Sequence, residues 1–209
     1  MTINEMPIII CFLKILYKIL NKITYFKFIY FFKIDNKQLS CSTDYKDDVE
    51  VFSEEDLLNF ADMCECDLNK KFVINAIKKG DVCFGIKKGK FLISYAWIAN
   101  SPTVLFDKCV IYFNRSKYVY LYKTFTIPEF RGMLFNSKVI SFSKKICQHK
   151  DIILFVDARN INSIRSVKKI GANLICCVII LKIFGNIKFF FSKKSNCGDF
   201  SISFISIPL

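Results

Sequence analysis

The sequence predicts an α/β (α+β) protein built on one mixed, mostly antiparallel sheet of about six or seven strands, with helices on both faces. Hydrophobic residues make up 53% and aromatic residues 16% of the 209 residues, which is enough for the core of one domain and excludes general disorder. The periodicity of the apolar residues gives two helices, an antiparallel hairpin, and then alternating strands and helices. This order is typical of a sheet covered on both sides.

The first two expected helices have clear start and stop signals. Ser53 is a suitable N-cap, and the acids Glu54, Glu55 and Asp56 fill the first turn after it. A second helix is expected over residues 67–79, because Gly80 stands where helices commonly end.

The remaining elements follow from alternating apolar residues and from Gly and Pro between them. A hairpin is expected from strands Val82–Ile86 and Phe91–Ala99, with its turn at residues 87–89. Further along we expect the strand Tyr118–Ile127, the helix Phe135–Gln148, the strand Asp151–Val156, the helix Ile161–Gly171, and two or three strands within residues 172–207.

Residues 1–40 form a hydrophobic, basic N-terminal segment that we separate from the main domain, residues 41–209. Lysines interrupt the apolar run of residues 7–34, so it is a poor membrane span, and it lacks the features of a secretory signal. Lys14, Lys18 and Lys22 share one face of a helix. Such a helix either contacts an anionic membrane or packs on the domain with its lysines in water, and residues 25–34 suit a first strand.

The net charge of +13 is unevenly distributed along the chain. Residues 41–70 hold two basic and ten acidic residues, whereas residues 71–209 hold 23 basic and six acidic ones. The long C-terminal part therefore attracts an anion, such as a phosphorylated cofactor, a nucleic acid or an anionic lipid. We rank the cofactor above nucleic acid, because the basic residues are not interleaved with aromatic residues as in single-strand binders.

The numbers and spacing of cysteine and histidine limit the disulfides and metal sites that the chain can form. The ten cysteines contain no C-x-x-C pair and mostly lie in apolar runs, which indicates free thiols in a reducing, cytoplasmic compartment. His149 is the single histidine, so a zinc site built on several histidines is excluded and no metal is expected.

Two motifs carry the functional prediction. In the first, the strand before Pro128 is followed by Arg131-Gly132 and a helix, in the stretch "TIPEFRGMLFNSKVISFSKKI". The second is "NINSIRSVKKIGA", which begins at Asn160, after a buried strand. A helix start directly after a strand can present bare backbone N–H groups to a phosphate.

With the hairpin upstream, these motifs make residues 81–172, about half of the chain, resemble the GNAT superfamily of CoA-dependent N-acyltransferases. The resemblance implies a GNAT-like fold and acetyl-CoA as co-substrate, without a metal. It also implies that backbone groups of the strand bind the pantetheine arm of CoA and that the helix start binds its pyrophosphate. The residues at these positions are Phe125, Thr126 and Ile127 for the arm, Arg131, Gly132, Met133, Leu134, Phe135 and Asn136 for the pyrophosphate, and Asn160 and Ser163 beside the arm. Candidates for the 3′-phosphate are Lys138, Lys144, Lys145 and Lys168.

The sequence departs from the family pattern at two places, the helix start that binds the pyrophosphate and the position of the catalytic acid. The family usually has glycine at the positions of Leu134 and Asn136, and many members have a tyrosine at the position of Val167 to protonate the leaving thiolate. Here that proton donor is Ser166, Tyr120, Tyr122 or bulk water. Of the few acids after residue 70, which include Asp81, Asp107, Glu129, Asp151 and Asp199, we take Asp157 as the first candidate for the general base.

The resemblance thus predicts an N-acetyltransferase in which a primary amine of an unidentified acceptor attacks acetyl-CoA directly. An amino sugar and a protein amine are the acceptor classes that we consider. The alternative is a catalytically inactive GNAT-fold module that binds a membrane or a partner through residues 7–34. A nucleic-acid binder would rest on charge alone.

Overall fold

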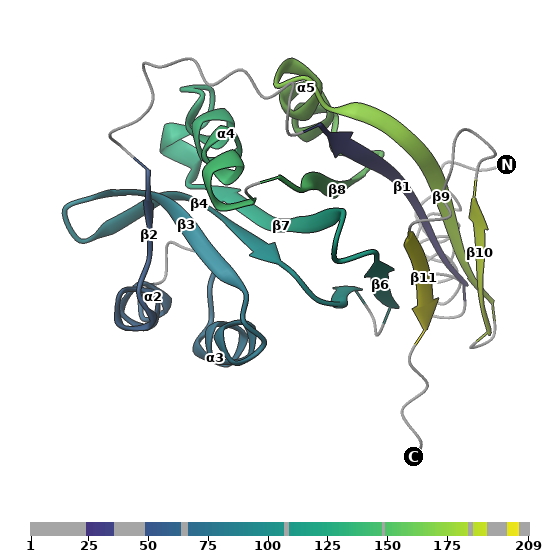
Figure 1. Cartoon of the computed structure of the whole chain (residues 1–209), viewed down its shortest axis with the longest axis horizontal. Coiled ribbons are helices and arrows are strands. Elements are labelled where there is room, and N and C mark those ends of the chain that lie inside the picture. The colour runs from purple at the N-terminus through teal and green to yellow at the C-terminus, as the bar shows by residue number, and fades with distance from the viewer. Residues whose placement is uncertain are drawn as a thin grey trace, which may run out of the picture.

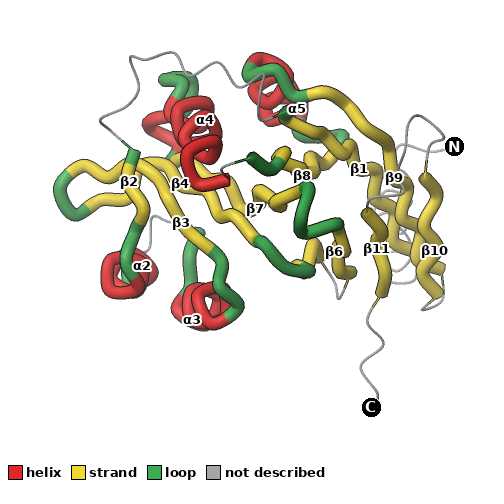
Figure 2. Tube along the Cα trace, in the orientation of Figure 1, coloured by secondary structure: helices red, strands yellow, loops and turns green. Residues whose placement is uncertain are grey.

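The computed structural model describes residues 24–35, 49–63, 67–106, 109–147, 149–183, 186–191 and 200–204. A twisted, eight-stranded sheet crosses the molecule, with α4 and α5 on one face and α2 and α3 on the other (Figure 1). A second sheet of three short strands lies beside it. Figure 2 shows the helices in red on either side of the yellow strands. The predicted mixed sheet with helices on both faces is therefore confirmed.

The strand order of the large sheet is β10-β9-β1-β8-β7-β4-β3-β2, and that of the small sheet is β11-β6-β5. All neighbouring strands are antiparallel except β7 and β8. The strands are β1 Thr24–Ile34, β2 Glu50–Val51, β3 Val82–Lys88, β4 Phe91–Ala99, β5 Thr103–Phe106, β6 Cys109–Phe113, β7 Tyr118–Thr126, β8 Asp151–Asp157, β9 Asn173–Ile183, β10 Asn186–Phe191 and β11 Phe200–Phe204. The helices are α2 Glu54–Ala61, α3 Lys70–Lys78, α4 Phe135–Cys147 and α5 Ile161–Lys169.

Capping residues and turn residues in the sequence correctly predict the ends of several of these elements. Ser53 caps α2 as predicted: its hydroxyl accepts the backbone N–H of Asp56, and the Asp56 carboxylate accepts from the Ser53 backbone in return. Gly80, after α3, has a φ of +83°, which glycine adopts without strain. Strand β4 and the start of α4 fall where the sequence predicts them.

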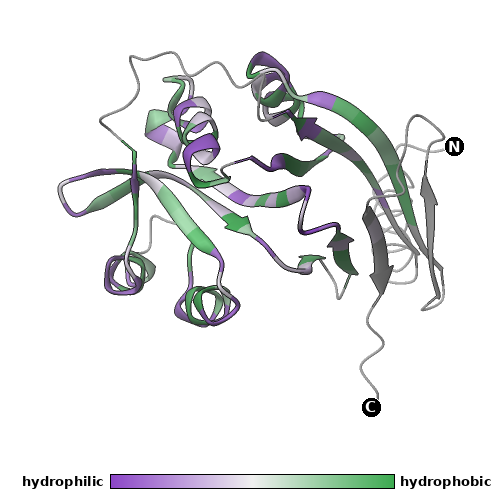
Figure 3. Ribbon diagram, in the orientation of Figure 1, coloured by the Kyte–Doolittle hydropathy of each residue, from purple (hydrophilic) through white to green (hydrophobic). Residues whose placement is uncertain are grey.

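The core consists of three groups of buried side chains. The first fills the space between the sheet and α4 and α5, and includes Val139 and Val167. The second lies on the opposite face of β1, β8 and β9 against β6, and the third packs under α2 and α3 around Trp97. Hydrophobic residues accordingly run along the strands, whereas the helices carry hydrophilic residues on the sides away from the sheet (Figure 3).

The N-terminal strand is an interior strand of the sheet. Strand β1 lies between β8 and β9 and is antiparallel to both. Ile29, Phe31 and Ile34 are fully buried. Residues 24–34 of the segment that we separated from the main domain thus belong to the same sheet. The boundary at residue 40 and the amphipathic helix expected before residue 24 lie outside the described residues, and that helix stays a prediction.

Three short strands were not predicted. Strands β2, β5 and β6 have two, four and five residues, and each forms only by pairing with a neighbour. Strand β2 extends the edge of the large sheet, which has eight strands instead of the expected six or seven, and β5 and β6 belong to the small sheet.

Among the described residues no helix is long and apolar enough to cross a membrane. Over the same ranges, no group of three or more His, Cys, Asp or Glu side chains is arranged to hold a metal ion.

Gly85 sets the distance between β3 and β4. A Cβ added there would lie 2.1 Å from the carbonyl oxygen of Ser94 and 2.8 Å from the Cα of Tyr95, so the backbone itself would have to move. We expect Gly85→Ala to lower the free energy of unfolding by about 3 kcal/mol or more in urea denaturation. Gly89→Ala is the control, because its added Cβ meets nothing and it carries only the strain of a φ of +59°, about 1–2 kcal/mol. Equal losses in the two variants would contradict this packing role.

Candidate functional site

Strands β7 and β8 part after a short parallel ladder. Tyr118, Val119 and Tyr120 pair with Asp151, Ile152 and Ile153, and the ladder ends there, although β7 runs on to Thr126 and β8 to Asp157. The other edge of β8 is paired with β1, and that of β7 with β4. We call the opening between the two strands beyond Tyr120 the slot. It leaves strand edges whose inward backbone groups are not used in a ladder.

A β-bulge lies in β7 beside the slot. Tyr122 pairs with Trp97 and Phe125 with Tyr95, so Lys123 and Thr124 stand opposite one residue of β4. Lys123 has a φ of +47°, a left-handed conformation that is rare for residues other than glycine. Its ammonium group lies 5.0 Å from the ring centre of Phe72, on the α3 side. Thr124 instead lines a cavity on the α4 side.

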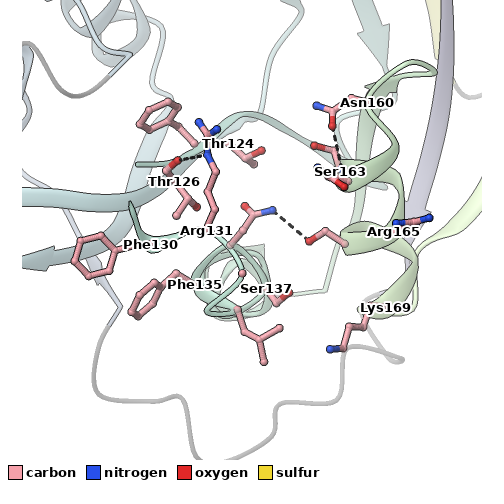
Figure 4. A pocket seen from close by; sticks show the side chains of 16 residues that line it. Thr124, Thr126, Phe130, Arg131, Phe135, Ser137, Asn160, Ser163, Arg165 and Lys169 are labelled. Atoms are coloured by element: carbon pink, nitrogen blue, oxygen red, sulfur yellow. Dashed lines mark hydrogen bonds between the residues drawn. The ribbon is translucent and has the colours of Figure 1, made fainter. Parts of the chain in front are cut away.

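This cavity has a volume of about 690 Å³, within the range of small-molecule sites. Its walls are the end of β7, the turn and first residues of α4, and one face of α5 (Figure 4). The lining residues are Thr124, Phe125, Thr126, Phe130, Arg131, Gly132, Leu134, Phe135, Asn136, Ser137, Asn160, Asn162, Ser163, Arg165, Ser166 and Lys169.

Helix α4 begins at the cavity without a side-chain cap. The carbonyl of Leu134 accepts the N–H of Lys138 at 3.0 Å, which puts Leu134 at the N-cap position. Its side chain has no hydrogen-bond acceptor, whereas Ser53, Asn69 and Asn160 cap the other three described helices with side-chain oxygens. The N–H groups of residues 135–137 have no acceptor within α4, because they precede its first intrahelical bond. The positive end of the helix dipole adds to their attraction for an anion.

The turn before α4 uses left-handed backbone at two positions. Gly132 has a φ of +85°, and Leu134 has a φ of +62°. Leu134 is one of the positions where the family resemblance expects glycine. This leucine has a left-handed backbone conformation that glycine would adopt without strain. The left-handed form costs a residue with a side chain about 1–2 kcal/mol. Leu134 is nevertheless 43% exposed and does not close the cavity that it lines.

Asn136 connects α4 to α5 across the cavity. Its side-chain Nδ2 donates to the hydroxyl of Ser166 at 3.4 Å. Its Oδ1 is buried and has no hydrogen-bond partner in the described part of the chain. A buried acceptor without a partner is costly, and the N–H of a ligand amide would satisfy it.

All charged residues that line the cavity are basic, namely Arg131, Arg165 and Lys169. The Nε of Arg131 donates to the carbonyl of Thr126 at 3.1 Å, which holds the guanidinium group between the end of β7 and α4. Arg165 and Lys169 come from α5 on the opposite wall (Figure 4). The cavity therefore suits a negatively charged ligand.

Most of the predicted cofactor-binding residues meet at this cavity. Phe125, Thr126, Arg131, Gly132, Leu134, Phe135, Asn136, Asn160 and Ser163 line it. Three others do not: Ile127 is buried in the core, Met133 is 57% exposed, and Lys168 lies outside the lining set. Lys138, Lys144 and Lys145 are not among the lining residues either.

The three predicted catalytic residues occupy different places. Ser166 lines the cavity. Tyr122 does not, and it donates a hydrogen bond to Asp81 on the α3 side. Asp157 ends β8, and Arg159 donates to it from Nε at 2.9 Å and from Nη2 at 2.8 Å. This bonding lowers the pKa of Asp157, which makes its carboxylate a weak proton acceptor. Val167, at the position of the family tyrosine, is buried in the core.

The motif comparison missed the basic face of α5. Asn162, Arg165, Ser166 and Lys169 all line the cavity and follow the i, i+3, i+4, i+7 spacing of one helix face. The sequence contains this signal, because once Ser166 is placed at the site, Lys169 shares its face and Lys168 does not. Thr124 was missed because the bulge that turns it toward the cavity arises from pairing with β4.

The ion pair of Asp157 gives a direct test of its proton affinity. Arg159→Ala removes the main cause of the lowered pKa, so the pKa of Asp157 should rise toward its ordinary value in a carboxyl ¹³C NMR titration. The backbone N–H of residue 159 still donates, so the rise should be incomplete. Arg165→Ala, on the neighbouring helix, should leave this pKa unchanged, and an equal shift in both variants would rule out the pairing as the cause.

Leu134 provides a test of the strained turn. In Leu134→Gly the strain of about 1–2 kcal/mol is relieved while the unfolded chain gains about 0.5–1 kcal/mol of freedom, so stability should change by less than about 1 kcal/mol. The matched change Leu58→Gly, inside α2, should cost about 2 kcal/mol or more through lost helix propensity and packing. Urea unfolding measures both, and similar losses in the two variants would contradict the strain.

No family model and no curated protein matches the sequence. Solved structures do match the fold. A GNAT-family acetyltransferase from Colwellia psychrerythraea is 16% identical with a TM-score of 0.56, over 76% of this chain and 57% of that protein. One from Novosphingobium aromaticivorans is 12% identical with a TM-score of 0.55, over 77% and 66%. A conserved Staphylococcus epidermidis protein of unknown function is 14% identical with a TM-score of 0.51, over 80% and 66%.

The chain spans between about half and two thirds of the length of these solved structures. At such low identity the likeness concerns the fold alone. The chain therefore has the GNAT fold.

Proposed function

We propose that this chain is an N-acetyltransferase that moves the acetyl group of acetyl-CoA to a primary amine. The observation that carries the proposal is the cavity beside the slot, where an uncapped helix start, three basic side chains and open strand edges meet. A diphosphate with an extended, amide-containing arm is a ligand that uses all three.

The pyrophosphate of CoA fits the start of α4. The N–H groups of residues 135–137 are directed to the same end of the helix, and they bind an anion without a charged side chain for each oxygen. Arg131 adds a fork of N–H donors at the same end, held in place by the Thr126 carbonyl. Lys169 and Arg165, on the facing wall, are the candidates for the remaining phosphate.

The pantetheine arm fits the slot. Its amides would pair with the edge of β7 at Phe125 and Thr126, in the way a further strand would. The unpartnered Oδ1 of Asn136 would accept an N–H from the same arm. The side-chain Oδ1 of Asn160 caps α5 by accepting the Ser163 N–H at 3.1 Å, so the Nδ2 group of the same side chain would donate to the ligand.

The described cysteines favour direct transfer over an acyl-enzyme. Cys83, Cys109, Cys147 and Cys176 are buried, and the half-buried Cys177 is not among the residues that line the cavity. Burial raises the pKa of Cys147 to about 12 and raises that of Cys83 well above its usual value, so neither provides a thiolate at neutral pH. In the proposed reaction the amine nitrogen attacks the thioester carbon, and the C–S bond breaks. The acceptor is a primary amine, and an amino sugar and a protein amine are the two classes that we consider.

One observation favours the alternative, an inactive GNAT-fold module. Val167 occupies the position of the tyrosine that protonates the thiolate in many family members, and it is buried in the core. A thiolate leaving group is a fairly stable anion, with a reference thiol pKa of about 8.5, so an enzyme can work without this tyrosine. The two alternatives differ in turnover, because a module of this fold could still bind CoA.

A matched pair of glycines tests the binding site. Gly132 and Gly80 have φ values of +85° and +83°, and an added Cβ meets nothing within 4 Å at either. Gly132→Ala and Gly80→Ala should therefore lose similar stability. Only Gly132→Ala should weaken acetyl-CoA binding in isothermal titration calorimetry, by at least about tenfold or 1.4 kcal/mol, because it displaces the amides at the start of α4.

The outcomes separate the hypotheses. Absence of acetyl-CoA binding by the wild-type chain would refute both the acetyltransferase and a CoA-binding module. Binding without acetyl transfer to any amine, as measured by release of free CoA thiol, would support the inactive module. Equal weakening by the two alanine variants would place the binding site away from α4.

A further inference from the structure

The slot also borders the face of the sheet that carries α3. Tyr120 is the last paired residue of β7, and Tyr122 and Phe155 are the next residues on that face of β7 and β8. Both rings stack on Tyr120, with centroid distances of 5.6 Å for Tyr122 and 6.1 Å for Phe155. The two side chains thus flank the slot on the side opposite the cavity, where a thioester that crosses the sheet would emerge.

Behind Tyr122 lies a buried carboxylate. The Asp81 side chain is 0% exposed, and its Oδ2 accepts both the phenol hydrogen of Tyr122 and the ammonium group of Lys79, the latter at 2.8 Å. Lys79 also donates to Thr103 at 2.7 Å. The Oδ1 of Asp81 is buried and has no hydrogen-bond partner among the described residues. A fully buried carboxylate with half of its acceptor capacity unused is unexpected for a purely structural group.

Asp81 also fixes the direction of the Tyr122 hydrogen. Because that hydrogen is donated to Asp81, the phenol oxygen presents only lone pairs to a ligand. Burial, followed by the bond to Asp81, strongly raises the pKa of Tyr122, so the phenol remains protonated at neutral pH. These properties make Tyr122 a poor acid for a thiolate and a good acceptor for the N–H of an amine.

The charged and titratable groups around Tyr122 come from three elements. Lys79 and Asp81 stand between α3 and β3, and Cys83 is on β3. Tyr120 and Lys123 are its neighbours on β7, and the ammonium group of Lys123 is paired with Asp67 at 3.0 Å. Among them, Asp81 is the carboxylate in hydrogen-bond contact with the phenol.

We propose that Tyr122 and Asp81 form the proton-accepting pair of the transfer reaction and receive the acceptor amine on the α3 side of the slot. This inference rests on the proposed function. It gives Tyr122 a different role from the thiolate acid expected from the sequence, and it assigns the base to Asp81 rather than Asp157.

The proposed step moves two protons from the amine nitrogen and one acetyl group from sulfur to nitrogen. The acceptor ammonium gives one proton to the Tyr122 oxygen as the phenol hydrogen moves to Asp81, which becomes neutral. The lone pair freed on nitrogen forms the C–N bond, and the C–S bond breaks with its electrons on sulfur. The second nitrogen proton goes to sulfur, so CoA leaves as a thiol. Asp81 then returns its proton through Tyr122 to water.

Two amines of similar size test this role. Ethylamine is charged at neutral pH and has to lose a proton before attack, whereas 2,2,2-trifluoroethylamine is already mostly uncharged. With saturating acetyl-CoA, Tyr122→Phe and Asp81→Asn should lower kcat/KM for ethylamine by about 10²-fold. They should change the value for trifluoroethylamine by less than about threefold. The ethylamine rate of Tyr122→Phe should also rise more steeply with pH than that of the wild type, because free amine replaces the lost proton acceptor.

Tyr118→Phe is the matched control, since it removes a phenol from the same face of β7, four residues before Tyr122, where the strand is still paired with β8. It should leave both rates within about twofold of the wild type. Calorimetry should give the same acetyl-CoA affinity for all variants, which shows that they fold.

Each contrary result has a distinct meaning. If Tyr122→Phe slows the two amines equally, or neither, the pair is structural and the inference is wrong while the acetyltransferase stands. If the wild type binds acetyl-CoA but acetylates neither amine, the proposed function and the pair are overturned together.

Discussion

The separation of β7 from β8 is the constraint on which the site depends. Two parallel strands part after three residue pairs, and each remains in the sheet because its other edge is paired along most of its length. Strand β1 holds β8 from Ile29 to Ile34, and β4 holds β7 on both sides of the bulge. Without these outer ladders, hydrogen bonding would favour closing the gap, since unpaired buried backbone groups are costly.

The bulge at Lys123 distributes side chains to the two sides of this gap. It leaves Tyr122 and Lys123 on the α3 side and turns Thr124 toward the cavity. One extra residue thereby gives the same strand a ligand-binding edge on one side of the sheet and a polar group on the other. The positive φ of Lys123 carries a local cost that the pairing with Asp67 and the contact with Phe72 help to offset.

The start of α4 lacks a stabilising side-chain cap and keeps its backbone N–H groups available to a ligand. A serine, aspartate or asparagine at the position of Leu134 would cap the helix and contribute about 1 kcal/mol. It would also occupy the N–H groups that face the cavity. An uncapped start with left-handed residues at Gly132 and Leu134 is less stable and keeps those groups available.

Local patterns predicted much of the fold and part of the site. The cap at Ser53, the end of α3 at Gly80 and strand β4 follow from residues within a few positions of one another, so the sequence reveals them. The place of β1 between β8 and β9 depends on partners more than a hundred residues away, which no local pattern encodes. The site divides in the same way: local spacing reveals the turn at Arg131 and Gly132 and the helix face that carries Lys169, whereas the place of Thr124 at the cavity depends on the pairing of β7 with β4. The contact between Tyr122 and Asp81 joins residues 41 positions apart.

The interior position of β1 has a consequence for biosynthesis. The ribosome releases β1 before the other described strands, and the strands that enclose it emerge roughly 120 residues later, which at typical elongation rates is on the order of ten seconds. During that time an aromatic segment with strong β-propensity waits without partners, in a form prone to aggregation. Lys27 and Lys33 interrupt its apolar run and are suited to act as gatekeepers against self-association. Productive folding of the nascent chain would then depend on these two lysines, or on a chaperone that shields the segment until its neighbours arrive.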